Sequence, residues 1–229
     1  MAAPDGFPTT RLSLILAAAG APGAQSQDAL AALCRMYWQP LYAFVRRRGH
    51  TADEAQDLTQ SFIARLLEKN SLRDFRHERG RFRAFLLGSL KNFLANQRDW
   101  ARAQKRGGGL PELPLDAARD DLTPDKVFEK QWALGLLQRV LALLREESVR
   151  AGKGDQFDRL KGYLTGDGEG VRYRQLAQEL GLSEGAVKVA VHRLRQRFHE
   201  ALREEVSLTV TRPEEIGDEI RHLIQAIRA

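Results

Sequence analysis

The residues best suited to bind nucleic acid lie in one segment, YRQLAQELGLSEGAVKVAVHRLRQR, which spans residues 173–197. Its polar side chains include cations that bind phosphates and groups that read the edges of base pairs by hydrogen bonds. They are Ser183, Glu184, Lys188, His192, Arg193 and Arg195. We therefore expect this segment to contact DNA through the polar surface of a helix.

The apolar residues of this segment predict two short helices that meet at a tight turn. Ala177 is small enough for crossing helices, Gly181 tolerates a left-handed turn, and Ser183 can cap the second helix. Leu176, Leu180, Leu182, Val187, Val191, Leu194, Phe198 and Leu202 are expected to face one core. This spacing is typical of a helix-turn-helix. A plain helical hairpin with solvated arginines is the alternative.

An acidic cluster marks the outer side of another predicted helix. Thr51 and Glu54 form a capping-box pattern, and apolar residues then repeat at intervals of three and four. The cluster with its apolar edge comprises Asp53, Glu54, Asp57, Leu58 and Gln60. Such a face can bind a basic protein surface, whereas the alternative is an ordinary solvated helix face.

Aromatic and basic residues alternate in FRAFLLGSLKNFLANQRDWARAQKR, which spans residues 82–106. Phe82, Leu86, Leu90 and Phe93 share a helical period and are expected to be buried. The remaining mixture is typical of a surface that grips single-stranded nucleic acid and holds an extruded base. The candidates, including the end of the charged connector 70–81, are Arg79, Arg81, Asn92, Asn96, Arg98, Trp100 and Arg102.

Composition divides the 229 residues into two small helical domains, and we expect an all-α fold. The net charge is +6, but it is segregated: residues 25–106 hold 16 Lys and Arg against 8 Asp and Glu, whereas residues 107–126 hold 2 against 5. The predicted parts are an N-terminal extension (1–24), a first domain (25–106), a flexible acidic linker (107–123), a second domain (124–205) and a C-terminal amphipathic extension (206–229). A period interrupted near Pro40 predicts a helical pair at the start of the first domain, and Thr123 with Pro124 predicts the start of a long helix.

Several kinds of site are not expected from this sequence. The histidines and the single Cys34 show no ligand spacing, so we predict no metal and no cofactor. A nuclease built on Asp53, Glu54 and Asp57 would lack a second cluster of metal ligands, and we expect no enzyme. No run reaches the about 20 apolar residues that cross a bilayer, so we expect no membrane insertion and a cytoplasmic protein.

These parts together resemble a small bacterial sigma-70 family factor of the extracytoplasmic-function (ECF) subfamily. The segment LCRMYWQPLYAFVRRRGHTADEAQDLTQSFIARLLE is similar to sigma regions 2.1 and 2.2, RGRFRAFLLGSLKNFLANQRDWARAQKR to regions 2.3 and 2.4, and the helix-turn-helix followed by RLRQRF to region 4.2. The resemblance implies that the acidic cluster binds the β′ clamp helices of core RNA polymerase. It also implies that the first domain recognises and melts the minus-ten element, while the second binds the β flap and reads the minus-35 element.

The resemblance leaves the base preference and the regulation open. Val189 and Ala190 stand where many relatives place polar or basic residues that touch DNA. An anti-sigma protein is one candidate regulator, and a Ser/Thr kinase acting on Thr59 is another. The C-terminal extension either caps the second domain or folds against a basic DNA-binding face. A stand-alone helix-turn-helix repressor or activator is the alternative function, although it does not explain the first domain.

Overall fold

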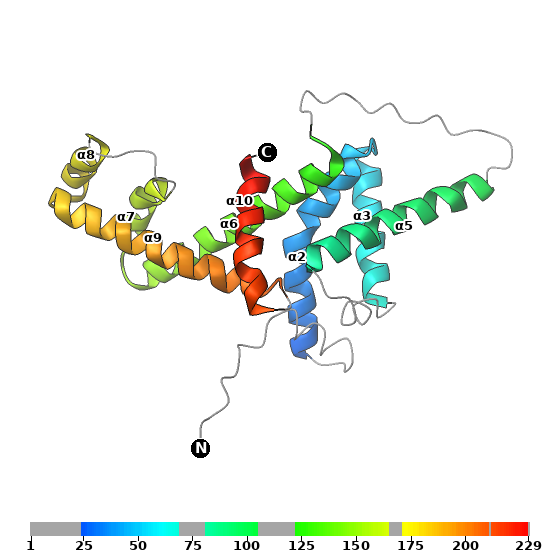
Figure 1. Cartoon of the computed structure of the whole chain (residues 1–229), viewed down its shortest axis with the longest axis horizontal. Helices are drawn as coiled ribbons and strands as arrows, with labels where there is room; N and C mark the ends of the chain where they lie inside the picture. Colours follow the sequence, from blue (N-terminus) through cyan, green and yellow to red (C-terminus); the bar gives the residue numbers. More distant parts are fainter. Residues whose placement is uncertain (1–23, 69–80, 105–121, 165–170, 211, 229) are drawn as a thin grey trace, which may run out of the picture. The chain divides into compact units, whose positions relative to one another are not determined.

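The structure is a computed structural model, and it describes residues 24–68, 81–104, 122–164, 171–210 and 212–228. Every regular element in these ranges is a helix, which confirms the predicted all-α fold for this part of the chain (Figure 1). The elements are α2 (Ala24–Arg47), α3 (Ala52–Glu68), α5 (Phe82–Gln104), α6 (Pro124–Arg150), α7 (Gly154–Leu160), η1 (Lys161–Tyr163), α8 (Val171–Leu180), α9 (Glu184–Ser207), η2 (Pro213–Glu215) and α10 (Ile216–Arg228).

The chain folds into two compact units. Unit 1 comprises Met1–Gly135 together with Val206–Ala229, and unit 2 comprises Leu136–Glu205. The division falls within α6, so the first half of this helix belongs to unit 1 and the second half to unit 2. The domain boundaries expected from composition stay predictions, and the predicted linker and N-terminal extension lie almost wholly outside the described residues.

The core of unit 1 forms where α2, α3 and α5 bury their apolar faces. Tyr37 packs edge-on against Phe82 with ring centroids 5.6 Å apart, and Phe62 packs against Phe93 at 5.7 Å. The predicted stripe of α5 is buried as expected. Burial of large aromatic and aliphatic side chains is the main term that stabilises such a helical unit.

Pro40 lies inside one continuous helix, so the predicted helical pair at this place is wrong. Proline removes one backbone donor, which normally weakens a helix. Here Pro40 is itself buried, and Tyr37, Leu41 and Phe44 on either side of it are no more than 2% exposed. Tertiary packing of this face therefore offsets the local loss.

The first half of α6 and helix α10 complete unit 1. The first half of α6 buries Phe128 and Trp132 completely. Helix α10 buries Ile216, Leu223 and Ala226 along one side. As the sequence indicated, Thr123 caps α6, with its Oγ1 accepting a hydrogen bond from the Lys126 N–H at 3.4 Å.

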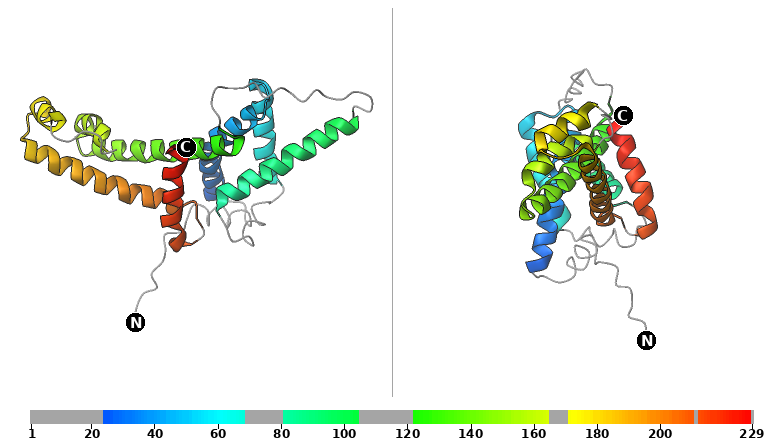
Figure 2. Two further views of the ribbon diagram at one scale, coloured as in Figure 1. Left: turned by 45° about the horizontal axis from the view of Figure 1, so that its top comes forward. Right: turned by 90° about the vertical axis from the view of Figure 1, so that its left-hand side faces the viewer.

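Unit 2 consists of the second half of α6 with α7, η1, α8 and most of α9 (Figure 2). Ion pairs join its helices at the surface. Arg145 of α6 pairs with Asp158 of α7 at 3.0 Å, and Arg197 of α9 donates to both carboxylate oxygens of Glu147 of α6, at 3.0 and 2.6 Å. A bidentate pair fixes the relative orientation of two helices better than a single contact does.

Candidate functional site

The acidic cluster lies on the outer surface of α3, as expected. Asp53, Glu54, Asp57 and Gln60 are exposed, while Leu58 is half-buried. The predicted capping box is present: the Thr51 N–H donates to Glu54 Oε2 at 2.8 Å, and the Glu54 N–H donates to Thr51 Oγ1 at 3.3 Å. The hydrogen bond from the Thr51 backbone lowers the pKa of Glu54 below its usual range. Glu54 therefore contributes to helix initiation as well as to the acidic surface.

Thr59 lies on the opposite side of the same helix. Its side chain is 0% exposed, and its hydroxyl donates to the Ala55 carbonyl oxygen at 2.7 Å. A phosphate on this oxygen would need the surrounding core to open. The kinase hypothesis at Thr59 thus requires a conformation of α3 other than this one.

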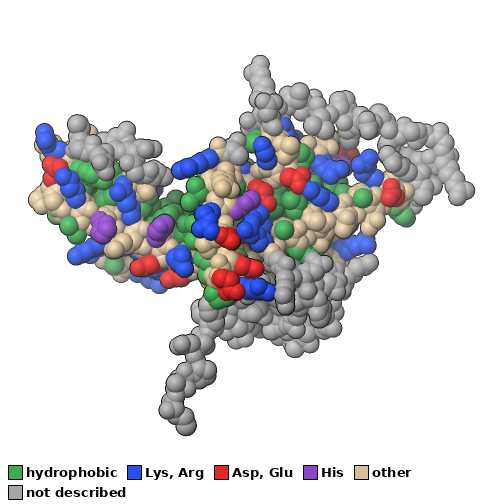
Figure 3. All heavy atoms as spheres, in the orientation of Figure 1, with side chains coloured by type: hydrophobic (Ala, Val, Ile, Leu, Met, Phe, Trp, Pro, Cys, Tyr) green, Lys and Arg blue, Asp and Glu red, His purple; other side chains and the backbone are tan. Residues whose placement is uncertain are grey.

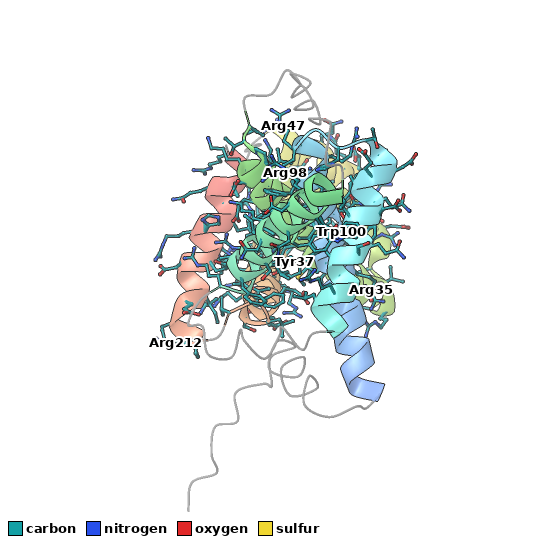
Figure 4. The ribbon with its side chains drawn as sticks, turned by 90° about the vertical axis from the view of Figure 1, so that its right-hand side faces the viewer. Arg35, Tyr37, Arg47, Arg98, Trp100 and Arg212 are labelled. Carbon is teal, nitrogen blue, oxygen red and sulfur yellow. The ribbon has the colours of Figure 1, made fainter. Side chains whose placement is uncertain are left out.

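Four of the residues expected to bind single-stranded DNA form an exposed surface on α5. Asn92, Asn96, Arg98 and Trp100 are all exposed, and the Trp100 side chain is 62% exposed. The spacing of four residues places Asn92, Asn96 and Trp100 on one side of the helix. Figure 4 looks toward the end of α5 that carries Arg98 and Trp100. An exposed indole beside amide groups can stack a base and hydrogen-bond its edge.

The other three candidates on this surface differ in what the structure places around them. Arg79 and the side chain of Arg102 lie outside the described residues, as does most of the connector 70–81. Arg81 is 35% exposed, and its Nε lies 2.9 Å from Oε2 of Glu219 in α10. The charge of Arg81 is therefore partly balanced from within the chain.

The buried partner of Glu219 is Arg83, which the sequence did not single out. Arg83 donates from Nε and Nη2 to the two oxygens of Glu219, at 2.6 and 3.2 Å. It also donates to Glu129 of α6, and its guanidinium lies 4.9 Å from the ring centroid of Trp132. Burial alone would lower the pKa of Arg83, but the hydrogen bonds and charges of Glu219 and Glu129 raise it above its usual range.

Arg81, Arg83, Glu129 and Glu219 form a cluster that we call the α10 ion cluster. Two further side chains lie beside it. His222 Nε2 lies 3.0 Å from Glu129 Oε2. Burial raises the pKa of the nearby Tyr37 hydroxyl, and the Glu219 carboxylate raises it further. The cluster contains two arginines and two carboxylates, so its charges balance within the chain.

A signal for this cluster exists in the sequence. Glu219 falls between Ile216 and Leu223 at helical spacing, and Arg83 falls in line with Leu87 and Leu90. A charged residue in the middle of an apolar stripe predicts a buried charge with a partner. The C-terminal extension thus contacts both α5 and the first half of α6. This half of α6 lies within the predicted second domain (124–205), which the extension was expected to cap.

Helices α8 and α9 of unit 2 meet at the glycine turn that the sequence predicted. Gly181 has φ +64°, its N–H donates to the Gln178 carbonyl at 3.3 Å, and the Leu182 N–H donates to the Ala177 carbonyl at 2.9 Å. These two bonds form a Schellman ending. Ser183 Oγ then accepts from the Ala186 N–H at 3.2 Å and caps α9.

One apolar prediction for this turn is wrong. Leu176, Ala177, Val187 and Val191 are buried in one cluster, but Leu182 is 40% exposed. Gly181, the left-handed residue before Leu182, ends helix α8 and changes the chain direction. The Leu182 side chain therefore does not continue the apolar face of that helix.

The polar residues expected to read duplex DNA are only partly available. Lys188, His192 and Arg193 are exposed on α9, where Figure 3 shows Lys, Arg and His side chains sharing the visible surface of unit 2. Glu184 pairs with Lys188 at 3.0 Å, and this contact lowers the pKa of Glu184. Arg195 donates twice to the Tyr163 carbonyl oxygen, at 3.1 and 2.9 Å. Arg195 therefore supports unit 2 directly.

Two kinds of feature do not occur within the described ranges. No group of three or more His, Cys, Asp or Glu residues there could hold a metal ion. Among the helices of those ranges, none is long and apolar enough to cross a membrane.

Comparison with known proteins gives one match. Residues 33–106 match the family model for sigma-70 region 2, and this range contains most of α2 with all of α3 and α5. No curated protein and no solved structure matches the chain. Sigma factors are non-enzymatic transcription factors, and the matched domain supports interaction with core RNA polymerase and promoter DNA. The match thus supports a sigma-70 family sigma factor, with a role in promoter recognition and transcription initiation.

Proposed function

We propose that this protein is an alternative sigma factor of the ECF subfamily, which directs core RNA polymerase to a specific set of promoters. The observation that carries the proposal is the exposed acidic surface of α3 inside the segment that matches sigma-70 region 2. A domain of this family needs a surface for polymerase, and Asp53 and Asp57 give α3 such a surface without disturbing the core.

The acidic surface of α3 binds the β′ clamp helices of the polymerase. The exposed carboxylates of this surface attract a basic partner over several ångströms and orient it on approach. Leu58 supplies apolar contact at the edge, and Gln60 supplies a hydrogen-bonding group. Because the acids are exposed, their contribution to binding is sensitive to salt.

Helix α5 recognises and melts the minus-ten element. Asn92, Asn96 and Trp100 follow one side of the helix, which matches the path of a single strand whose bases stack and hydrogen-bond in succession. Arg98 is exposed nearby and can bind the backbone phosphates. Release of Arg81 from Glu219 would add a further cation to this surface.

Helices α8 and α9 read the minus-35 element as a helix-turn-helix, with α9 in the major groove. The capped start of α9 and the exposed side chains of Lys188, His192 and Arg193 support this proposal. Contact with the β flap, control by an anti-sigma protein and a cytoplasmic location belong to the same proposal.

Affinity for purified bacterial core RNA polymerase tests the proposal. The full chain is compared with a double variant, Asp57→Arg with Leu58→Ala, whose charge and apolar edge are both altered. Glu146→Arg is the matched control, because Glu146 is a similarly exposed acid, 68% exposed, on a helix of unit 2. We expect tight binding by the full chain and by the control, and a loss of at least tenfold for the double variant.

Two results would contradict the proposal. Absence of core binding by the unaltered chain would favour a stand-alone DNA-binding regulator, which must then bind a specific duplex tightly without polymerase. Equal losses in the double variant and in Glu146→Arg would show that general charge, and not the α3 surface, governs binding.

A further inference from the structure

The exposed side of α9 has an apolar centre. Gly185, Ala186 and Val189 are all exposed, and Val189 is 49% exposed although valine is usually buried. At about 100° per residue, Val189 lies about opposite the mean direction of Val187 and Val191, which face the core of unit 2. We call Gly185, Ala186 and Val189 the apolar strip.

Polar side chains, two of them cationic, lie at the edges of this strip. Lys188, His192 and Arg193 are exposed beside Val189 along the same helix. Glycine and alanine near the helix start allow close approach of another surface, and a β-carbon added at Gly185 would touch only the Ser183 side chain, at 4.0 Å. An apolar centre with a cationic border fits the major groove, where phosphates flank the exposed base edges.

Most hydrogen-bonding groups that could read bases here are already used inside unit 2. Ser183 Oγ accepts the Ala186 N–H, and Arg195 is held by the Tyr163 carbonyl. Glu184 is paired with Lys188. In the major groove, the apolar group that a base pair presents is the C5-methyl of thymine.

We propose that Val189 reads thymine, by contact of its methyl groups with the C5-methyl of a base in the duplex bound by α9. This inference rests on the proposed function and adds a base preference to it. His192 and Arg193 position the helix by binding phosphates on either side. The duplex element should therefore contain at least one thymine whose methyl group, not its hydrogen-bonding pattern, is selected.

The size of the effect follows from one buried methyl group. Removing about one CH₂ equivalent from water contributes about 0.8 kcal/mol, which corresponds to about fourfold in Kd. Loss of the thymine methyl should produce a change of this size, and truncation of Val189, which removes both of its methyl groups, should produce at least this change. Because both changes remove the same contact, the two together should cost little more than either alone.

The experiment uses the full chain bound to core RNA polymerase. Duplexes are selected from a random pool with this complex, and each thymine of the selected upstream element is replaced in turn by deoxyuridine, which lacks only the methyl group. Binding is measured for the unaltered chain and for Val189→Ala. Val149→Ala is the matched control, because Val149 is an equally exposed valine, 50% exposed, of unit 2.

We expect one thymine at which deoxyuridine weakens binding about fourfold for the unaltered chain and for Val149→Ala, but not for Val189→Ala. No effect at any position, or an equal effect in Val189→Ala, overturns the inference and leaves the proposed function intact. A Val189→Ala variant that loses core affinity but keeps its DNA affinity would also overturn it, because the strip would then bind protein. If the complex selects no duplex or does not form, the proposed function fails, and the inference with it.

Discussion

Arg83 and Glu219 form a bidentate pair in which neither side chain is more than 4% exposed. One residue lies near the start of α5 and the other in the last helix, 136 residues later. Because a buried charge needs compensation, loss of either residue would leave the other with one fewer partner: Arg83 would keep only Glu129, and Glu219 would keep only Arg81. The pair ties the extension to the segment that matches sigma-70 region 2.

Substitution of Glu219 by alanine is expected to destabilise unit 1. Arg83 would then keep Glu129, while Arg81 would lose its contact with Glu219, and the free energy of unfolding should fall by about 3–5 kcal/mol, the usual cost of breaking a buried pair. Urea unfolding followed by circular dichroism measures this, with Glu214→Ala as the control because Glu214 is exposed. Equal midpoints for the two variants would show that the pair contributes nothing to stability.

Acid should weaken the start of α3 through Glu54. The pKa of Glu54 is lowered in the folded state, so its cap stabilises the helix at neutral pH. This contribution is lost as the pH falls below the ordinary glutamate value of about 4.3 and through the lower folded value. The thermal midpoint of Glu54→Gln should therefore depend less on pH between about 5 and 3 than that of the unaltered protein. Parallel pH curves for the two proteins would contradict this.

Arg195 and Arg193 should differ in what they support. Arg195→Ala removes two hydrogen bonds to the Tyr163 carbonyl. It should lower the free energy of unfolding of unit 2 by about 1–3 kcal/mol, and its thermal midpoint should fall accordingly. Arg193→Ala should leave the midpoint unchanged and lower duplex affinity, with a smaller salt dependence. Hydrogen exchange in α8 and α9, together with binding at two salt concentrations, separates the two effects. The reverse assignment would exclude Arg195 as a structural residue.

Gly181→Ala is expected to cost about 1–2 kcal/mol, because a β-carbon at φ +64° strains the backbone although nothing lies within 4 Å of it. Gly181→Asn should cost less, since asparagine tolerates this conformation better. Chemical unfolding of both variants gives the comparison. Gly162→Ala is the control, because that glycine lies in η1, its added β-carbon also meets nothing within 4 Å, and its φ is not in the left-handed range. A Gly181→Ala variant as stable as this control would mean that the turn relaxes without strain.

Local features of this chain were predictable because they depend on neighbouring residues. The caps at Thr51, Thr123 and Ser183 and the turn at Gly181 each need only a few adjacent positions. The buried stripe of α5 follows from its period alone.

Features that depend on distant packing were not predictable in the same way. The helix through Pro40 survives because other helices bury its faces, and the partner of Arg83 comes from the far end of the chain. Asn92 and Trp100 on α5 are exposed, and their binding of DNA stays a prediction, but Arg81 is bound by a carboxylate that no local pattern connects to it. An ion pair between residues far apart in the sequence becomes evident only when the fold is known.

The ion pair between Arg83 and Glu219 cannot form during synthesis of the chain until Glu219 has been added. A ribosome that adds about 5–20 residues per second needs roughly ten seconds to reach Glu219 after it has made Arg83. Until then, Arg83 at the start of α5 lacks the carboxylate that α10 supplies. We therefore expect unit 1 to reach its final stability only after α10 has left the ribosome.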